Sequence, residues 1–551
     1  MSKWVNTMNT NNFDNPIGND VNATSGYLPD VALLTRMVNE LFSASSSTVT
    51  ATEAHSPVTV PELEIPTFTA DHTYAKSLLS SSPATIPLPF EAELRALSVP
   101  AQNATTTPAV APPRPTLGSS FYFLEEATSL GRTEREPQFV NGRSAFDVNA
   151  IKRDFPILKE LVNGRPLIWL DNAATTQKPQ AVISRLAHFY QHENSNIHRA
   201  AHELAARATD AYEASRQKVK HFLNAPSVDE IIFVRGTTEG INLVAQSWGR
   251  QNISEGDEIV ISWLEHHANI VPWQQLCNEK GAKLRVAPVD DDGQILLEEY
   301  QKLLNSRTKL VAFSQVSNAL GTVTPARQMI EMAHQVGARV LVDGAQSVSH
   351  MKVDVQQLGC DWFVFSGHKV FGPTGIGALF GKAELLDSMP PWQGGGNMIR
   401  DVTFEKTTYH GAPARFEAGT GNIADAVGLG AAIDYVQRIG IDNINRYEHQ
   451  LMTYATRGLN TVSGLRLIGT AKEKAGVLSF TLKGFTSEQV GEALNREGIA
   501  VRSGHHCAQP ILRRFGLETT VRPSLALYNT CADIDVLISV LHRIQNKHDS
   551  F

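Results

Sequence analysis

The stretch LVDGAQSVSHMKVDVQQLGCDWFVFSGHKVFGPTGIGALFG, residues 341–381, decides the fold class of this chain. Three short apolar runs, at 339–343, 362–366 and 377–380, lie in it or at its edge, and each is typical of a buried strand. Strand-like and helix-like segments alternate along the chain around it, with further strands expected at 166–170, 230–234, 258–262, 283–289 and 309–314. This order predicts an α/β fold with a mostly parallel sheet that helices cover on both faces.

The N-terminal part of the chain has a different composition from the rest. Residues 1–145 are rich in Ser, Thr, Pro and Ala, and contain two lysines and no cysteine. Such a segment buries too little apolar surface to offset chain entropy, so it is predicted to be disordered. Three apolar islands interrupt it, at 27–42, 89–97 and 119–127, and they are expected to dock either on the protein's own core or on another protein.

With 551 residues, the chain is expected to form at least two folded domains. Residues 146–410 are predicted to form a large cofactor-binding domain. Residues 411–551, where helices become longer and strands fewer, are predicted to form a smaller α/β domain. About the first 20 residues of the large region are alternatively assigned to the small domain.

Composition excludes several classes of function. The formal net charge is −7, so the chain has no basic footprint for nucleic acid. The four cysteines, Cys277, Cys360, Cys507 and Cys531, match no metal-ligand spacing, which predicts no metal site and a reducing compartment. Because residues 1–20 lack a signal core and no apolar run is long enough to cross a bilayer, the sequence predicts a cytoplasmic protein without a membrane anchor.

Asp343 and Lys369 form the strongest chemical signal. Each follows a predicted strand, and ligands bind at the carboxyl ends of strands in an open parallel sheet. An enzyme that uses pyridoxal 5′-phosphate needs a lysine amine to form an imine with the cofactor and a carboxylate to keep the pyridine nitrogen protonated. The small, apolar and Gly-rich sequence around both residues distinguishes them from ordinary surface charges. Gln346, shortly after Asp343, is a candidate hydrogen-bond partner for the phenolic oxygen of the ring.

A phosphate seat is predicted where a strand runs into Gly236, Thr237 and Thr238 before a helix. Backbone N–H groups at a helix N-terminus attract a dianion, and the threonine hydroxyls can donate to it. This motif alone is weak, because threonine is also a common helix cap. Ser366 and His368, next to Lys369, are candidates to complete the seat.

His266 and Cys507 are the candidate acid–base group and nucleophile. His266 follows the predicted strand at 258–262, where an imidazole can stack on a cofactor ring and move protons, although a structural histidine is the alternative. Cys507 lies in AVRSGHHCAQPIL, where Gly504 permits a tight loop. Arg502 and the neighbouring imidazoles favour the thiolate that a cysteine nucleophile needs.

Eight motifs together resemble one family. They are LDNAATTQKP, EHHANIVPWQ, SNALGT, VDGAQS, FSGHK, FEAGTGN, VRSGHHCA and RPSLALYNT. The set is similar to the group II, or SufS-type, cysteine desulfurases of the class V aminotransferase family, a group that includes selenocysteine lyases, and the resemblance covers about residues 146–545. It implies the type I fold of pyridoxal-phosphate transferases, with a seven-stranded type of sheet in the large domain, and it implies a homodimer.

The resemblance also implies a role for each matching residue. Lys369 would form the imine, His266 would stack on the ring, and Asp343 and Gln346 would bind the pyridine nitrogen and the phenolic oxygen. Thr237, Thr238, Ser366 and His368 would hold the phosphate, and Thr420 would reach the phosphate of the neighbouring subunit. Asn318 and Arg522 would bind the substrate carboxylate, and Arg199 would line the entrance. Cys507 would take the sulfur of L-cysteine as a persulfide, leaving L-alanine. Gly421 and Pro523 depart from the family pattern beside Thr420 and Arg522.

Partners and alternatives follow from the same resemblance. The persulfide would pass to a SufE-like or SufU-like protein or to a small thiol. The islands of residues 1–145 resemble those of desulfurases carried as cargo in family 2A encapsulin shells, which implies a targeting role and a location inside a cytoplasmic nanocompartment. The alternatives are a selenocysteine lyase with the same residues, a transaminase of the same fold that makes no use of Cys507, and a scaffold with a degenerate site.

Overall fold

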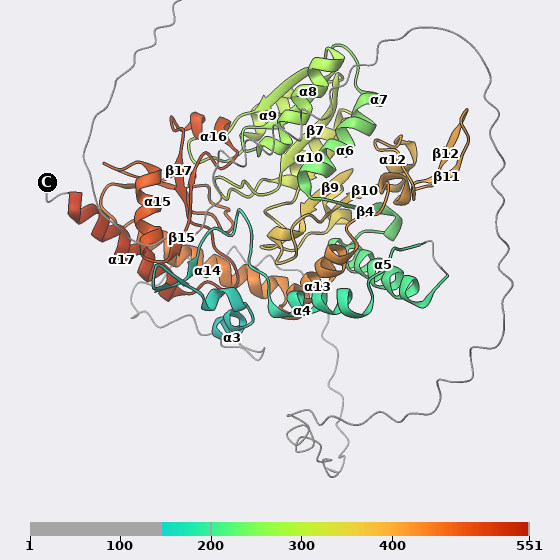
Figure 1. The fold of residues 1–551 in the computed structure, drawn as a ribbon. Helices are drawn as coiled ribbons and strands as arrows, with labels where there is room; N and C mark the ends of the chain where they lie inside the picture. The colour runs from blue at the N-terminus through green and yellow to red at the C-terminus, as the bar shows by residue number, and fades with distance from the viewer. Residues whose placement is uncertain (1–145, 199–200, 549–551) are drawn as a thin grey trace, which may run out of the picture. The chain divides into compact units, whose positions relative to one another are not determined.

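A computed structural model describes residues 146–198 and 201–548 (Figure 1). The predicted disordered extension, its three islands and Arg199 lie outside the described residues. The large sheet contains seven strands in the order β4-β10-β9-β8-β7-β5-β6. Their bounds are β4 Ile231–Val234, β5 Glu258–Ser262, β6 Lys283–Ala287, β7 Thr308–Ser314, β8 Arg339–Asp343, β9 Trp362–Ser366 and β10 Gly377–Gly381.

The predicted mostly parallel sheet is confirmed, with β10 as its exception. This strand pairs antiparallel with both β4 and β9, whereas β9, β8, β7, β5 and β6 are parallel neighbours. The segment between β9 and β10 is short and glycine-rich. A parallel crossover needs a dozen or more residues, so this connection can only return the chain antiparallel.

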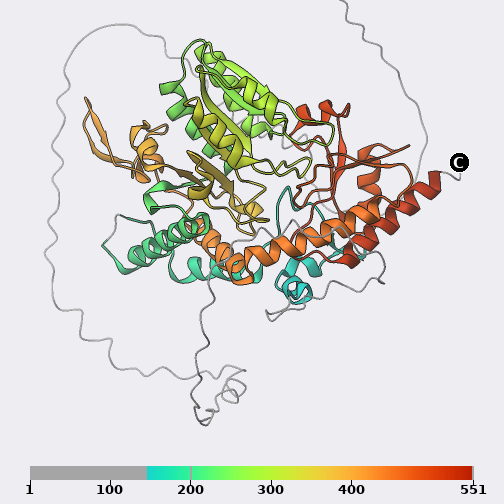
Figure 2. The same cartoon turned by 180° about the vertical axis from the view of Figure 1, so that it is seen from behind.

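Helices cover both faces of the sheet because alternate strand residues point to opposite sides. In β8, Val340 and Val342 belong to a core with residues of α5 (Glu203–Leu223), α10 (Ala326–Gln335) and α13 (Ile423–Ile439). Leu341 belongs to a second core with residues of α6 (Thr237–Val244) and α8 (Val271–Lys280). The helices α4 (Gln180–His192), α5 and α13 pack together, as Figures 1 and 2 show from opposite sides.

A second sheet and core lie in the C-terminal part of the chain. The sheet has the order β13-β14-β17-β16, with bounds Leu465–Leu467, Phe480–Leu482, Thr520–Arg522 and Arg502–Gly504. The helices α14 (Ile441–Leu459), α15 (Ser487–Arg496) and α17 (Cys531–His548) pack with it. The expected strand at 166–170 is shorter, β3 Ile168–Trp169, and pairs with β15 Ile499–Ala500 rather than with the large sheet.

Shorter elements complete the described chain. They are α3 Val148–Arg153, β1 Leu161–Val162, β2 Arg165–Pro166, α7 Arg250–Asn252, α9 Leu297–Leu303, α11 Val355–Leu358, α12 Ala383–Ser388, β11 Ile399–Val402, β12 Thr407–Tyr409 and α16 Gln509–Arg514. Within the described ranges, no helix has the length and apolar character to cross a bilayer. The same ranges contain no cluster of three metal-ligating side chains.

Candidate active site

A cavity of about 250 Å³ opens where the carboxyl ends of β7, β8 and β9 face the C-terminal sheet. Eleven of the predicted site residues line it, from both parts of the chain. They are Thr237, Thr238, His266, Asn318, Asp343, Gln346, Ser366, His368, Lys369, Cys507 and Arg522. The parallel strands bring these side chains together because their carboxyl ends share one edge of the sheet.

Lys369 and Asp343 both line this cavity and interact electrostatically. Lys369 ends the short 3-10 turn Gly367–Lys369 that follows β9, and Asp343 is the last residue of β8. Burial lowers the pKa of the Lys369 amine to about 8, although the Asp343 carboxylate opposes that shift. Burial raises the pKa of Asp343, against the N–H of Ala345 and the charge of Lys369. The pair therefore offers a partly neutral amine beside a buried carboxyl group, as a lysine-bound pyridinium cofactor requires.

The phosphate seat is built from β4, α6 and β9. Thr237 begins α6, and its backbone N and Oγ1 both lie 2.9 Å from the Ser366 Oγ. A Cβ on Gly236 would lie only 3.0 Å from the same Ser366 oxygen, so the close approach of the turn after β4 to the end of β9 favours glycine here. Burial, followed by the charges of Lys369 and Lys178, lowers the pKa of His368 to about 4. His368 is therefore neutral at physiological pH.

His266 is neutral with its proton on Nε2. Its Nδ1 accepts a hydrogen bond from the N–H of Ala268 at 3.0 Å, so that nitrogen carries no proton. Burial, with a further contribution from the charge of Lys369, lowers its pKa to about 3. The ring lines the cavity and therefore offers an N–H donor there.

Three polar atoms that line the cavity are buried and lack a hydrogen-bond partner among the described residues. They are the Nε of Arg522, the Oδ1 of Asn318 and the Nδ1 of His506. Buried polar atoms are rarely left unpaired, so a polar ligand is expected in the cavity. The other atoms of these groups are engaged: Arg522 Nη1 donates to Asn318 O at 2.9 Å, and Asn318 Nδ2 donates to His506 O at 2.6 Å.

Cys507 lies on a strained loop after β16. His506 and Cys507 both have a positive φ, 54° and 53°. Residues other than glycine rarely adopt this backbone conformation. The loop is held on both sides, because His267 N donates to Cys507 O at 2.8 Å and Cys507 N donates to His505 Nδ1 at 3.0 Å. Cys507 is half-buried and lines the cavity.

Asp171 is a site residue that sequence reasoning missed. Its carboxylate accepts from Arg502 at 3.0 Å and from Arg522 at 3.3 Å, so it joins the two arginines at the edge of the cavity. The available signal was an acidic residue directly after a strand in the motif LDNAATTQKP. Asp171 is far from Arg502 and Arg522 in sequence, so the sequence does not show that its carboxylate pairs with them.

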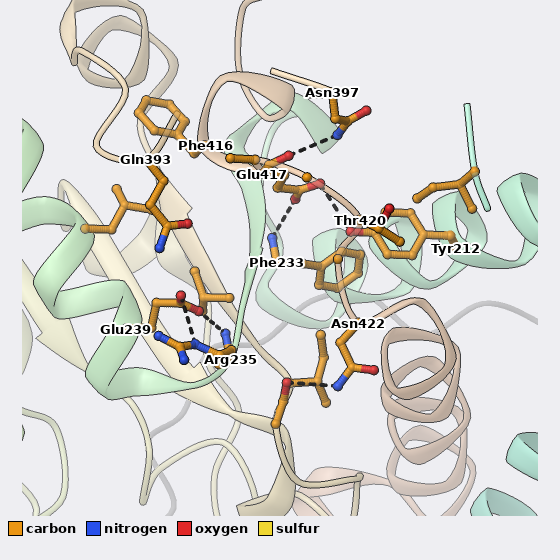
Figure 3. Close-up of a pocket in the computed structure, with 18 of the residues that line it drawn as sticks. Tyr212, Phe233, Arg235, Glu239, Gln393, Asn397, Phe416, Glu417, Thr420 and Asn422 are labelled. Carbon is orange, nitrogen blue, oxygen red and sulfur yellow. Dashed lines mark hydrogen bonds and ion pairs between the residues drawn. The ribbon is translucent and has the colours of Figure 1, made fainter. Parts of the chain in front are cut away.

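Thr420 lies in a second and larger cavity of about 650 Å³ rather than beside Lys369 (Figure 3). This cavity is lined by Tyr212, Arg235, Glu239 and Thr420 among others, and neither Lys369 nor Cys507 contributes to it. Beside Thr420, the buried Glu417 accepts hydrogen bonds from Arg216, Tyr212 and the N–H of Phe233. One chain therefore does not bring Thr420 to its own phosphate seat.

Comparison with known families identifies the chain. The family model of class-V aminotransferases matches residues 168–537. The chain belongs to this family. A cysteine desulfurase of Synechococcus elongatus is 68% identical over 446 residues, which cover 78% of this chain and 71% of the relative. A cysteine desulfurase of Klebsiella pneumoniae is 53% identical over 400 residues, which cover 72% of this chain and 98% of the relative. A probable cysteine desulfurase of Mycolicibacterium paratuberculosis is 64% identical, and the matched region covers 61% of its length.

Solved structures agree with this assignment. The apo cysteine desulfurase of Thermococcus onnurineus matches with a TM-score of 0.69 and 37% identity, covering 72% of this chain and 97% of that one. The cysteine desulfurase CsdA of Escherichia coli, with an S-sulfonic acid, matches with a TM-score of 0.69 and 39% identity, covering 73% of this chain and 99% of that one. The chain is therefore an enzyme of the cysteine desulfurase type with the type I fold, and pyridoxal phosphate is its cofactor. The unpaired buried atoms and the Lys369–Asp343 pair fit that group.

Proposed function

We propose that this protein is a group II, SufS-type cysteine desulfurase that moves the sulfur of L-cysteine onto Cys507 and releases L-alanine. The single observation that carries the proposal is that one cavity is lined by Lys369, Arg522 and Cys507 together. An amine, a carboxylate-binding guanidinium and a nucleophilic thiol are the three groups that this reaction needs. The Klebsiella relative, covered almost completely, bears the name cysteine desulfurase.

The residues that line the cavity have separate roles in this reaction. Arg522 and Asn318 hold the carboxylate of the substrate, and Lys369 removes the proton from its Cα. Bound pyridoxal phosphate supplies a sink for the electron pair released at that carbon. The Cys507 thiolate forms a bond to the substrate sulfur as the carbon–sulfur bond breaks. That bonding pair stays with Cβ of the substrate, which takes up one proton to become the methyl group of alanine, and the Nε2 proton of His266 is available for this transfer.

Replacing the nucleophile tests the proposal. Cys507→Ala should retain the cofactor absorbance of the wild type and form no protein persulfide when it is mixed with L-cysteine. Cys531→Ala, at the start of α17, is the matched control and should form persulfide normally. Alanine and persulfide are quantified by mass spectrometry after a single turnover. Persulfide at the normal rate in Cys507→Ala would show that another residue receives the sulfur.

We infer that the acceptor of the sulfur is a SufE-like or SufU-like protein or a small thiol. The half-buried position of Cys507 supports transfer from the protein surface rather than release inside the cavity. Comparing alanine production with each acceptor class at equal concentration identifies the partner.

The substrate preference is a separate question. Faster turnover of selenocysteine than of cysteine would favour a selenocysteine lyase instead of a cysteine desulfurase.

We also infer that the enzyme is a homodimer in which Thr420 serves the phosphate of the partner subunit. The location of Thr420 in the larger cavity, away from Lys369 of its own chain, supports this assignment. Thr420→Ala should weaken pyridoxal phosphate binding while the mass measured by light scattering stays that of a dimer. A monomer in solution, or unchanged cofactor affinity in Thr420→Ala, would contradict the inference.

We further propose that residues 1–145 load the enzyme into an encapsulin shell inside the cytoplasm. The support is the resemblance of the islands at 27–42 and 119–127, together with the Synechococcus match, which covers more of this chain than residues 146–551 contain. Co-expression with a family 2A shell protein should yield loaded shells with the full chain and empty shells with residues 146–551. Equal loading of both chains would rule out this role.

A further inference from the structure

The peptide group between His368 and Lys369 is held by an unusual number of donors. The carbonyl oxygen of His368 lies 3.0 Å from the backbone N of Thr176 and 3.1 Å from its Oγ1. The Oγ1 of Thr175 is also 3.1 Å away, and the Nζ of Lys178 is 3.4 Å away. All of these donors come from one segment, residues 171–178, which follows β3 in the sequence. That segment therefore fixes the orientation of the peptide from which the Lys369 side chain leaves.

The hydroxyl of Thr176 also binds the chain on the other side of Lys369. Its oxygen accepts a hydrogen bond from the N–H of Phe371 at 2.8 Å while its proton is directed to the carbonyl of His368. Phe371 has a φ of 64°, which a bulky residue adopts only when its surroundings hold it there. Thr176 is 2% exposed, so these two hydrogen bonds are shielded from bulk water, and loss of the hydroxyl would leave buried polar groups without this partner.

We propose that Thr176 is a positioning residue for Lys369. A single hydroxyl bridges the His368–Lys369 peptide group and the Val370–Phe371 peptide group, and it thereby holds the turn Gly367–Lys369 so that Lys369 lines the cavity that Asp343 also lines. This inference rests on the proposed role of Lys369 as the cofactor-binding lysine. The burial and the hydrogen bonds of the Thr176 hydroxyl support this role, and the role can be tested through cofactor binding without measuring turnover.

Residues 171–178 also contact residues on the arginine side of the cavity. The position of this segment therefore affects the reaction. Asp171 contacts Arg522, and the carbonyl of Ala173 accepts from the Nε2 of Gln346 at 2.7 Å. The segment thus touches the proposed carboxylate-binding arginine at one end and the lysine turn at the other. Reacting groups must be aligned within a fraction of an ångström for fast chemistry, so a shift of this segment would disturb the distance between them.

Two substitutions at one position separate the hydroxyl from the shape of the side chain. Thr176→Val keeps the volume and removes the hydroxyl, which leaves the N–H of Phe371 buried without a partner. Thr176→Ser keeps the hydroxyl. The readouts are the dissociation constant for pyridoxal phosphate and the pH titration of the absorbance band of the bound cofactor. We expect Thr176→Val to bind the cofactor about tenfold more weakly, with a displaced titration midpoint, and Thr176→Ser to stay near the wild type.

Thr308→Val is the matched structural control. Thr308 is 1% exposed at the start of β7, the sheet end opposite to the cavity, and its Oγ1 accepts from Asn305 N at 3.1 Å and donates to Leu303 O at 3.5 Å. This substitution should lower the melting temperature without moving the absorbance titration. An equal displacement in Thr308→Val, or wild-type cofactor binding and titration in Thr176→Val, would overturn the inference.

Two further variants keep the test decisive. If Thr176→Val does not fold, Thr175→Val replaces it, because this hydroxyl donates to the same His368 carbonyl without contacting Phe371. It should displace the titration in the same direction by a smaller amount, and no displacement would overturn the inference. Lys369→Ala separates this failure from failure of the proposed function, because a normal cofactor band in that variant would remove the role of Lys369 itself.

Discussion

Burial controls the protonation of the individual residues around the cavity. Lys369, His266 and His368 each lose affinity for protons mainly because their charged forms are removed from water. The lysine amine and the two imidazoles therefore all favour the neutral form. A neutral amine is the form that attacks an aldehyde, so the low pKa of Lys369 prepares the apoenzyme for its cofactor.

The rate at which apoenzyme captures pyridoxal phosphate should rise through a midpoint near pH 8. Below that pH the Lys369 amine, whose pKa is lowered to about 8, is protonated and cannot attack, and above it the amine is neutral. Stopped-flow absorbance between pH 6 and pH 11 measures the profile. Asp343→Asn removes the charge that opposes the shift, so its midpoint should move to lower pH. A wild-type midpoint at the ordinary lysine pKa, about 10.4, would contradict this account.

Asp171 should contribute strongly to stability through Arg522. Arg522 is 2% exposed and Asp171 is its carboxylate partner, so Asp171→Asn leaves a buried cation without an anion. We expect the free energy of unfolding to fall by about 3 kcal/mol. Arg502→Gln, which breaks the more exposed pair with the same carboxylate, should cost less than about 1 kcal/mol. Urea unfolding of both variants checks the contrast, and equal losses would contradict it.

At the scale of elements, the cysteine loop depends on contacts from another part of the chain. Residues 505–508 connect β16 to α16, but His267, shortly after β5 in the sequence, donates its N–H to Cys507 O and accepts from Gln509 N at 3.4 Å. The rings of His267 and His505 stack with centroids 5.8 Å apart. The loop is therefore positioned by the segment that follows β5 as well as by hydrogen bonds within the loop.

His267→Leu should release this loop. The amides of Cys507 and Gln509 should lose protection from hydrogen exchange by about three- to tenfold, the effect expected for one neutral hydrogen bond. His192→Leu is the matched control, because His192 also pairs with a second ring, His188, but on the distant helix α4. Unchanged protection in His267→Leu would show that the backbone contacts alone hold the loop.

The same contact predicts a pH dependence of the loop. Burial, with the charge of His505, lowers the pKa of His267, and its Nε2 can accept a hydrogen bond only while it is neutral. His505 and His266 are the titratable rings beside it, and the charge of His505 opposes an imidazolium at His267, whereas His266 is neutral. Protection of the Gln509 amide, corrected for the intrinsic exchange rate, should therefore persist below the ordinary histidine pKa and fall at lower pH. His267→Gln, which accepts without titrating, should lessen that fall.

At the scale of the whole molecule, the described part of the chain contains extensive cores. Helices within residues 146–548 pack on both faces of the large sheet and on the C-terminal sheet. A chain of residues 146–551 should therefore unfold within about 2 °C of the full protein and convert cysteine at the same rate. Calorimetry and alanine assays on both chains measure this. A large loss of stability would show that residues 1–145 pack on the enzyme.

Sequence patterns were enough to predict the α/β class and most of the residues that line the active-site cavity. Asp343, Lys369 and His266 each follow an apolar strand, and parallel strands place their carboxyl ends at one edge whatever the details of packing. Local sequence also predicted the loop at Cys507, because Gly504 permits a tight turn just before the two histidines and the cysteine. The antiparallel direction of β10 was not predicted, although the short connection between β9 and β10 is visible in the sequence.

Contacts between segments that are distant in sequence became visible in the folded chain. The tertiary structure paired Asp171 with Arg522, it placed the Thr176 hydroxyl across the Lys369 turn, and it separated Thr420 from the lysine of its own chain. It also decided the protonation of His266 and Lys369, since desolvation depends on every atom packed around a group. These properties arise from the approach of residues far apart in the chain, and a periodic pattern of apolar residues carries no information about which polar atoms will meet.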